Sequence, residues 1–266
     1  MNNNTGYPSK SKTSLFVFLF AILFSFETVQ AQQQNENVSA STQTTQDQSS
    51  LLEARKINPT TVELIFSDRR IMTVDFYGDH IFRIFQDNKG GILRDPVANP
   101  PAQILVDRPR EKVSRLEVND DNGTIDIITP KVKISFDKKT TLFTVTNLQA
   151  QKVVIEEIAP VQFEDKKVTL SLKENPEEYF YGGGVQNGRF SHKGKAIAIE
   201  NQNSWTDGGV ASPTPFYWST QGYGMMWYTF KKGKYDFGAE KAGIVKLQHE
   251  TDYLDLFFMV DDGTVA

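Results

Sequence analysis

Hydrophobic and polar residues alternate with a period of two along most of the chain after residue 50. Short runs rich in β-branched residues carry the pattern at 61–66, 71–76, 80–85, 124–129, 131–136, 141–146, 153–158 and 253–260. Such alternation predicts half-buried strands, with one face toward a core and the other toward water. We find no long amphipathic helical pattern after residue 50. The sequence therefore predicts an all-β fold of antiparallel sheets, arranged as a sandwich or barrel.

Turn-forming residues separate several of these runs. Gly78-Asp79, Asn122-Gly123, Asp137-Lys138-Lys139 and Asp165-Lys166 are typical of hairpin connections between antiparallel strands. The segment 87–109 has little pattern and holds four prolines, so we expect a long irregular connection there.

The N-terminus has the features of an export signal. Lys10 and Lys12 precede an apolar run at 15–26, and Val29-Gln30-Ala31 provides a small-residue cleavage pattern. The apolar run is too short to span a bilayer, so we expect no stable membrane span. We predict a signal peptide at 1–31, a disordered polar linker at 32–50, and a folded domain at 51–266 in a periplasmic or extracellular protein.

Composition excludes several kinds of site. The net charge of −4 argues against nucleic acid as a partner, because phosphate binding needs a basic surface. The chain has no cysteine, which excludes disulfides, a thiolate nucleophile and a cysteine-based zinc site. His80, His192 and His249 lie on separate elements without metal-ligand spacing. We expect neither a metal nor a cofactor.

Residues 174–238 are rich in aromatic, amide and glycine residues, and Trp205, Trp218 and Trp227 lie within 23 positions. Proteins bind sugars by stacking aromatic rings on C–H faces and by fixing hydroxyl groups with polar side chains. Trp218 and Trp227 lie in strand-like runs, where a core position is the commoner outcome. Trp205 lies in a polar loop and is open to either interpretation.

Other residues in this stretch also have two interpretations. The glycines at 182–184 resemble a phosphate cradle, but neither a helix nor a lysine-serine pair follows. We expect them instead to permit positive φ or close backbone approach. Asp207, before two glycines, is either a turn carboxylate or a ligand contact. We expect His192, beside Arg189 and Lys193, to be a polar surface group; an acid–base role for it is the alternative.

Three motifs in this stretch resemble glycoside hydrolase family 31, which includes α-glucosidases and α-xylosidases. The motifs read YFYGGG at 179–184, NSWTD at 203–207, and PFYWST at 215–220 followed by GYG at 222–224. The resemblance implies a β-sandwich of galactose-mutarotase-like shape in front of a (β/α)₈ catalytic barrel. It implies that the loop with Trp205, Thr206 and Asp207 contacts the substrate, and we add Arg189 and His192 as candidates. The string at 186–194 also resembles a bacterial subgroup acting on substituted sugars such as α-N-acetylgalactosaminides.

The family cleaves glycosidic bonds with two aspartates on the barrel, which needs roughly 250 residues. This chain stops at Ala266, so we expect a front-end fragment of an exported α-glycoside hydrolase, inactive alone and lacking its barrel partner. The expected ligand is an α-linked oligosaccharide or glycoside. Two alternatives remain: a stand-alone carbohydrate-binding module, and a mutarotase-type epimerase using His192 near Glu200.

Overall fold

The computed structural model of the chain describes residues 49–87, 105, 112–121, 123–188 and 190–261. These residues lie within one compact unit, Gln46–Ala266. Every regular element in the described part of the chain is a β-strand, and every strand pair is antiparallel. The all-β prediction is therefore confirmed.

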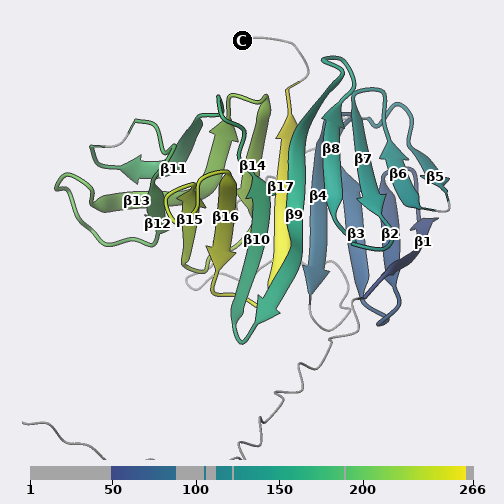
Figure 1. The fold of residues 1–266 in the computed structure, drawn as a ribbon, viewed down its shortest axis with the longest axis horizontal. Helices are drawn as coiled ribbons and strands as arrows, with labels where there is room; N and C mark the ends of the chain where they lie inside the picture. The colour runs from purple at the N-terminus through teal and green to yellow at the C-terminus, as the bar shows by residue number, and fades with distance from the viewer. Residues whose placement is uncertain (1–48, 88–104, 106–111, 122, 189, 262–266) are drawn as a thin grey trace, which may run out of the picture. The chain divides into compact units, whose positions relative to one another are not determined.

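The strands form two sheets that stack as a sandwich (Figure 1). The eight-stranded sheet contains, in spatial order, β1 (Leu51–Lys56), β2 (Thr61–Phe66), β3 (Ile71–Phe76), β4 (Ile81–Asp87), β17 (Tyr253–Val260), β14 (Tyr223–Trp227), β13 (Val210–Ser219) and β11 (Phe180–Gln186). The nine-stranded sheet contains β12 (Ala196–Ile199), β15 (Gly233–Phe237), β16 (Ile244–His249), β10 (Lys167–Lys173), β9 (Lys152–Glu164), β8 (Phe143–Asn147), β7 (Val132–Asp137), β6 (Thr124–Ile128) and β5 (Glu117–Asp120).

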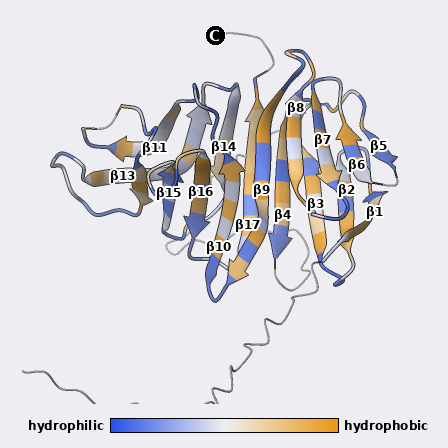
Figure 2. Cartoon of the chain, in the orientation of Figure 1, coloured by the Kyte–Doolittle hydropathy of each residue, from blue (hydrophilic) through white to orange (hydrophobic). Residues whose placement is uncertain are grey.

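The period-two pattern places one side of each strand in a shared core. In β2, Val62, Leu64 and Phe66 are buried, and the residues between them are partly exposed. The same alternation appears in β7, with Ile134 buried at its centre. Figure 2 shows hydrophobic and hydrophilic residues alternating along these strands. Burial of the apolar sides between the sheets stabilises the sandwich, because it removes hydrocarbon from water.

The strand predictions were confirmed in place, with differences at the ends. Strands β2, β3 and β17 have the predicted bounds, whereas β4, β6, β7 and β8 differ by one or two residues at either end. Strand β9 runs six residues beyond the predicted end at 158, and its pairing with β10 is irregular there. The β3–β4, β7–β8 and β9–β10 turns join antiparallel neighbours as predicted.

Some predictions fall outside the described residues. These are the signal peptide at 1–31, nearly all of the linker at 32–50, and most of the connection at 87–109. Strand β1 begins at Leu51, where the sequence predicts the start of the folded part. Within the described residues, no helix is long and apolar enough to cross a membrane.

Candidate functional site

Three consecutive glycines shape the antiparallel pair of strands β11 and β13. Gly182, Gly183 and Gly184 all have positive φ, between 75° and 111°. A Cβ on Gly184 would lie only 2.1 Å from the carbonyl oxygen of Ser212 on the facing strand. The expectation of positive φ and close backbone approach is confirmed, because an L side chain fits neither the φ nor the space.

The loop 201–209 is anchored at the end of this strand pair where Gln186 of β11 pairs with Val210 of β13. The Asn187 amide donates to Gly209 O at 3.0 Å, and the Gly208 amide donates to Asn187 O at 2.9 Å. The Asn187 side-chain Nδ2 donates to Ser204 O at 2.7 Å. Asn187 therefore holds the loop on both sides of residues 205–207, at Ser204 and at Gly208 and Gly209, which limits the freedom of this segment before any ligand binds.

This anchored loop presents Trp205, Thr206 and Asp207 to solvent. The side chain of Trp205 is 74% exposed, which is unusual for so large a hydrophobic group. The Asp207 carboxylate lies beside Gly188, where a Cβ would be 2.9 Å from Asp207 Oδ1. The loop thus offers an aromatic face, a hydroxyl group and a carboxylate on three successive residues, a combination suited to a sugar ring and its hydroxyls.

His192 is buried, so the expectation of a surface position is wrong. Its Nε2 lies 2.8 Å from Gly182 O, and its backbone amide donates to Phe180 O at 2.9 Å. Because a carbonyl only accepts, Nε2 carries a proton and donates it to the glycine strand. Glu200, the other half of the epimerase alternative, is exposed instead, with its carboxylate 3.8 Å from Lys232 Nζ. Arg189 lies outside the described residues.

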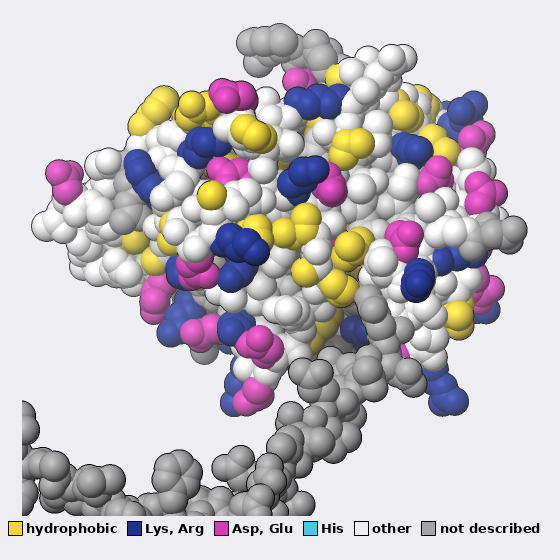
Figure 3. Space-filling model, in the orientation of Figure 1, with side chains coloured by type: hydrophobic (Ala, Val, Ile, Leu, Met, Phe, Trp, Pro, Cys, Tyr) yellow, Lys and Arg dark blue, Asp and Glu magenta, His cyan; other side chains and the backbone are white. Residues whose placement is uncertain are grey.

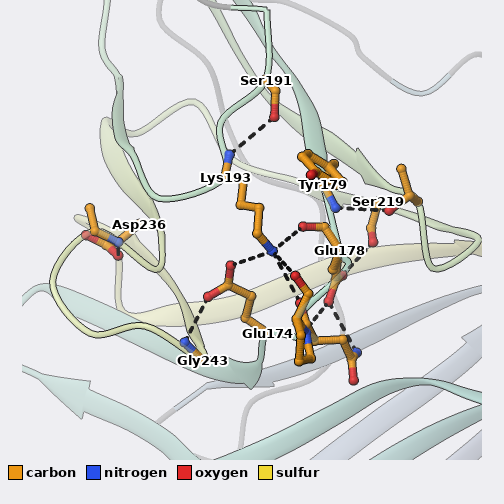
Figure 4. A network of polar contacts seen from close by, with 12 residues as sticks. Glu174, Glu178, Tyr179, Ser191, Lys193, Ser219, Asp236 and Gly243 are labelled. Carbon is orange, nitrogen blue, oxygen red and sulfur yellow. Dashed lines mark hydrogen bonds and ion pairs between the residues drawn. The ribbon is translucent and has the colours of Figure 1, made fainter.

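A polar network surrounds the start of β11 (Figure 4), whereas the loop adjoins the other end of this strand at Gln186. The Lys193 ammonium donates to Pro176 O at 2.6 Å and to Glu178 O at 2.8 Å, and lies 3.4 Å from Glu174 Oε1. The buried Glu178 carboxylate accepts from Ser219 Oγ at 2.5 Å and from Tyr223 OH at 3.0 Å. The Glu178 bonds tie the segment just before β11 to β13 and β14, and Lys193 holds that segment from the other side, which fixes the strands that carry the loop.

The tryptophans divide differently from the sequence expectation. Trp227 is fully buried in the core, as expected. Trp218 is 46% exposed, so the expectation of a core position is wrong for it. It is flanked by buried Tyr217 and Ser219, which places it on the outer side of the strand. Phe190, 87% exposed, is a further surface aromatic, and sequence reasoning gave it no role. The position of Phe190 beside Arg189 in a polar turn was the feature of the sequence that could have indicated an exposed ring.

The remaining chemistry of the surface is mixed. Figure 3 shows acidic and basic side chains interspersed, without a continuous basic area on the face that it displays. Among the described residues, no group of three histidine, aspartate or glutamate side chains is placed to hold a metal ion.

The comparisons with known proteins agree with this architecture. The sequence model of the glycosyl hydrolase 31 N-terminal galactose mutarotase-like domain matches residues 71–236. No curated protein sequence matches the chain.

Several solved structures share the fold. A dextranase of glycoside hydrolase family 31 from Flavobacterium johnsoniae, complexed with isomaltotriose, superposes with a TM-score of 0.69 at 15% identity, covering 81% of this chain and 26% of its own. A family 31 α-xylosidase from a soil metagenome, complexed with xylose, has a TM-score of 0.63 at 16% identity, covering 79% and 32%. A cycloalternan-forming enzyme from Listeria monocytogenes, complexed with a pentasaccharide substrate, has a TM-score of 0.64 at 13% identity, covering 80% and 21%.

The chain thus spans a fifth to a third of the length of these three enzymes. The family model covers well over half of the chain and includes strands β11 and β13 and the 201–209 loop. By this match and by its fold, the chain belongs to the N-terminal galactose mutarotase-like domain family of glycosyl hydrolase 31.

Proposed function

We propose that this chain is the N-terminal domain of an exported α-glycoside hydrolase and that its 201–209 loop contacts the substrate. The observation that carries the proposal is the exposed trio Trp205, Thr206 and Asp207, which Asn187 holds from both sides. A loop that is already held in place loses less conformational entropy when the sugar binds, so more of its interaction energy appears as affinity.

The hydrolytic step belongs to a catalytic barrel that follows this domain in the complete protein. There a pair of aspartates would cleave the glycosidic bond with retention of configuration. The loop would close one side of the sugar site, with the Trp205 ring against a C–H face and the Asp207 carboxylate accepting from sugar hydroxyls. The isomaltotriose and xylose bound by the structural neighbours support an α-linked glucosyl or xylosyl ligand.

Kinetics of the complete enzyme test the proposal. The reading frame beyond Ala266 should encode a barrel, and the purified full-length protein should release p-nitrophenol from p-nitrophenyl α-glucoside or α-xyloside. Asp207→Asn should lower kcat/KM by about 10- to 100-fold, because a hydrogen bond to a charged group is worth about 1.5–3 kcal/mol. The matched control is Asp165→Asn in the exposed β9–β10 turn, which should leave kcat/KM unchanged.

Two results would refute the proposal. A stop codon directly after Ala266 would leave a stand-alone carbohydrate-binding module. Unchanged kinetics in the Asp207→Asn enzyme would remove the loop from the substrate site.

A further inference from the structure

The outer side of the eight-stranded sheet carries a row of cross-strand neighbours that runs from Tyr181 through Trp218 and Gly224 to Met259. Tyr181 stacks on Trp218 with ring centroids 4.4 Å apart and an interplanar angle of 23°. Phe190 meets the Tyr181 ring edge-on at 5.4 Å. The indole is therefore supported on the side of β11 and held in one orientation.

On the other side of the indole, the neighbour in the row is Gly224, which has no side chain. A Cβ there would lie 3.2 Å from the Phe216 ring, so this ring forms the floor beside the indole. An open hollow of about 520 Å³ lies here, and its lining includes Trp218, Phe216 and Met259. Its size lies in the range of small-molecule sites.

Polar groups surround this apolar floor. Thr220, His80 and Asp261 also line the hollow. Thr220 Oγ1 accepts from the Tyr179 amide at 2.9 Å, which leaves its hydroxyl proton available to a ligand. Asp261 is held in place through its backbone, because its amide donates to Gly222 O at 2.9 Å and its carbonyl accepts from Asn147 Nδ2 at 2.7 Å.

We propose that this hollow, the Trp218 hollow, is a second carbohydrate-binding site that takes one pyranose ring against the free face of the Trp218 indole. A pyranose with equatorial hydroxyls, such as glucose or xylose, has apolar C–H faces and a polar circumference. An aromatic wall with a hydroxyl, an imidazole and a carboxylate around it is complementary to that shape. Because Tyr181 already fixes the indole, binding loses little side-chain entropy there.

This site is separate from the 201–209 loop. The loop adjoins Val210 at the start of β13, and Trp218 lies eight residues further along the same strand. Strand β13 bulges over this stretch, because the facing residues of β11 advance only from Tyr181 to Gln186. At about 3.3 Å per residue of β11, the start of β13 and Trp218 lie roughly 17 Å apart. One sugar ring cannot reach both, so the hollow would hold a distant part of a long glycan or a second chain.

The indole Nε1–H signals in two-dimensional ¹H–¹⁵N NMR spectra test the proposal directly. The chain has three tryptophans, and Trp205→Phe and Trp218→Phe assign their signals. We expect titration of the purified chain with isomaltotriose or xylose to shift the Trp218 signal to saturation. The buried Trp227 signal is an internal reference, and mannitol, a polyol without a ring face, should have no effect.

Variants separate this site from the loop. The Trp218 shift should persist in Trp205→Ala and Asp207→Ala. In Trp218→Ala, xylose affinity at the Thr220 amide signal should fall about ten-fold, whereas Phe230→Ala, another exposed aromatic, should leave it unchanged. An unchanged Trp227 signal shows that each variant is folded.

The Trp218 signal decides the inference. If only the Trp205 signal shifts, the hollow is not a sugar site while the proposed loop contact stands. If only the Trp218 signal shifts, the hollow binds sugar and the loop contact is refuted in this chain. If neither shifts, the inference is wrong, and the kinetics of the complete enzyme still decide the proposed function.

Discussion

Arg83 and Asp255 form a bidentate ion pair across β4 and β17, although 172 positions separate them in the sequence. Arg83 Nε and Nη2 each lie 2.7 Å from a carboxylate oxygen, and both side chains are buried. The hydrogen bonds and charge of Asp255 outweigh the effect of burial and raise the pKa of Arg83. The guanidinium also lies over the rings of Tyr228 and Phe257.

Removing one partner of this pair should destabilise the fold strongly. Asp255→Asn removes the carboxylate that binds the buried Arg83 guanidinium with two hydrogen bonds, and we expect a loss of about 3–5 kcal/mol in the free energy of unfolding. The double variant Arg83→Met/Asp255→Leu should recover most of that loss. Urea unfolding followed by circular dichroism measures both, and equal losses in the single and double variants would contradict the prediction.

Glu157 should make the protein less stable as the pH rises. Burial raises the pKa of this carboxyl group to about 8, against 4.5 for an ordinary glutamate, and one hydrogen bond from the Phe143 amide opposes the shift. Between these values the folded state keeps a proton that the unfolded state releases, so stability falls by up to about 1.4 kcal/mol per pH unit. Glu157→Gln should flatten this part of the stability curve, as measured by urea unfolding from pH 5 to 9. A slope unchanged by the substitution would mean that Glu157 titrates normally.

His249 should make the protein less stable as the pH falls into the acid range. Burial lowers the pKa of its imidazole to about 4, from an ordinary value of 6.5. Its Nδ1 donates to Lys231 O at 2.9 Å, and its Nε2 lies 3.1 Å from Tyr235 OH and accepts from that hydroxyl. The unfolded state therefore binds the extra proton, and stability is lost as the pH falls from about 6.5 toward 4. NMR titration of the imidazole should find it neutral at pH 5.5; a charged ring there would refute the assignment.

Two glycine substitutions should separate backbone strain from steric clash. Gly184→Ala and Gly194→Ala both place a side chain at positive φ, at +76° and +68°. A Cβ at Gly194 has nothing within 4 Å, whereas at Gly184 it meets Ser212 O at 2.1 Å. We expect a loss of about 1 kcal/mol for Gly194→Ala and at least about 3 kcal/mol for Gly184→Ala in chemical unfolding. Similar losses would mean that the β11–β13 approach is looser than the structure shows.

Asn187→Ala should loosen the 201–209 loop without unfolding the sandwich. The variant loses the hydrogen bond from Asn187 Nδ2 to Ser204 O and keeps the backbone bonds to Gly208 and Gly209. Hydrogen exchange at the Ser204 amide should therefore quicken, while exchange in β7 stays unchanged. Gln202→Ala, in the exposed first part of the loop, is the matched control. Equal exchange in both variants would mean that the Asn187 side chain does not anchor the loop.

Much of the strand content could be predicted because local alternation reports which side of a strand meets the core. The runs that became β2 and β3 alternate over most of their length, and the run that became β17 is apolar except for Asp255. No run was predicted at β1, β5, β10, β12, β15 or β16. Strands β12 and β15 are hard to recognise, because AIAI and GKYDF are short and lie in the glycine-rich stretch. The length of β9 was also missed, since irregular pairing with β10 disturbs its alternation at Ala159.

The all-β class, the antiparallel turns, the positive φ of the glycines at 182–184 and the family resemblance can be read from the sequence alone, because each depends on residues close together in the chain. The burial of His192, the half-exposed position of Trp218 and the contact between Arg83 and Asp255 arise only when distant segments pack together. The strand pattern gives Trp218 a side of its sheet, but its exposure depends on what lies beside it. That neighbour is Gly224 of β14, and which strands become neighbours is settled only when the two sheets assemble.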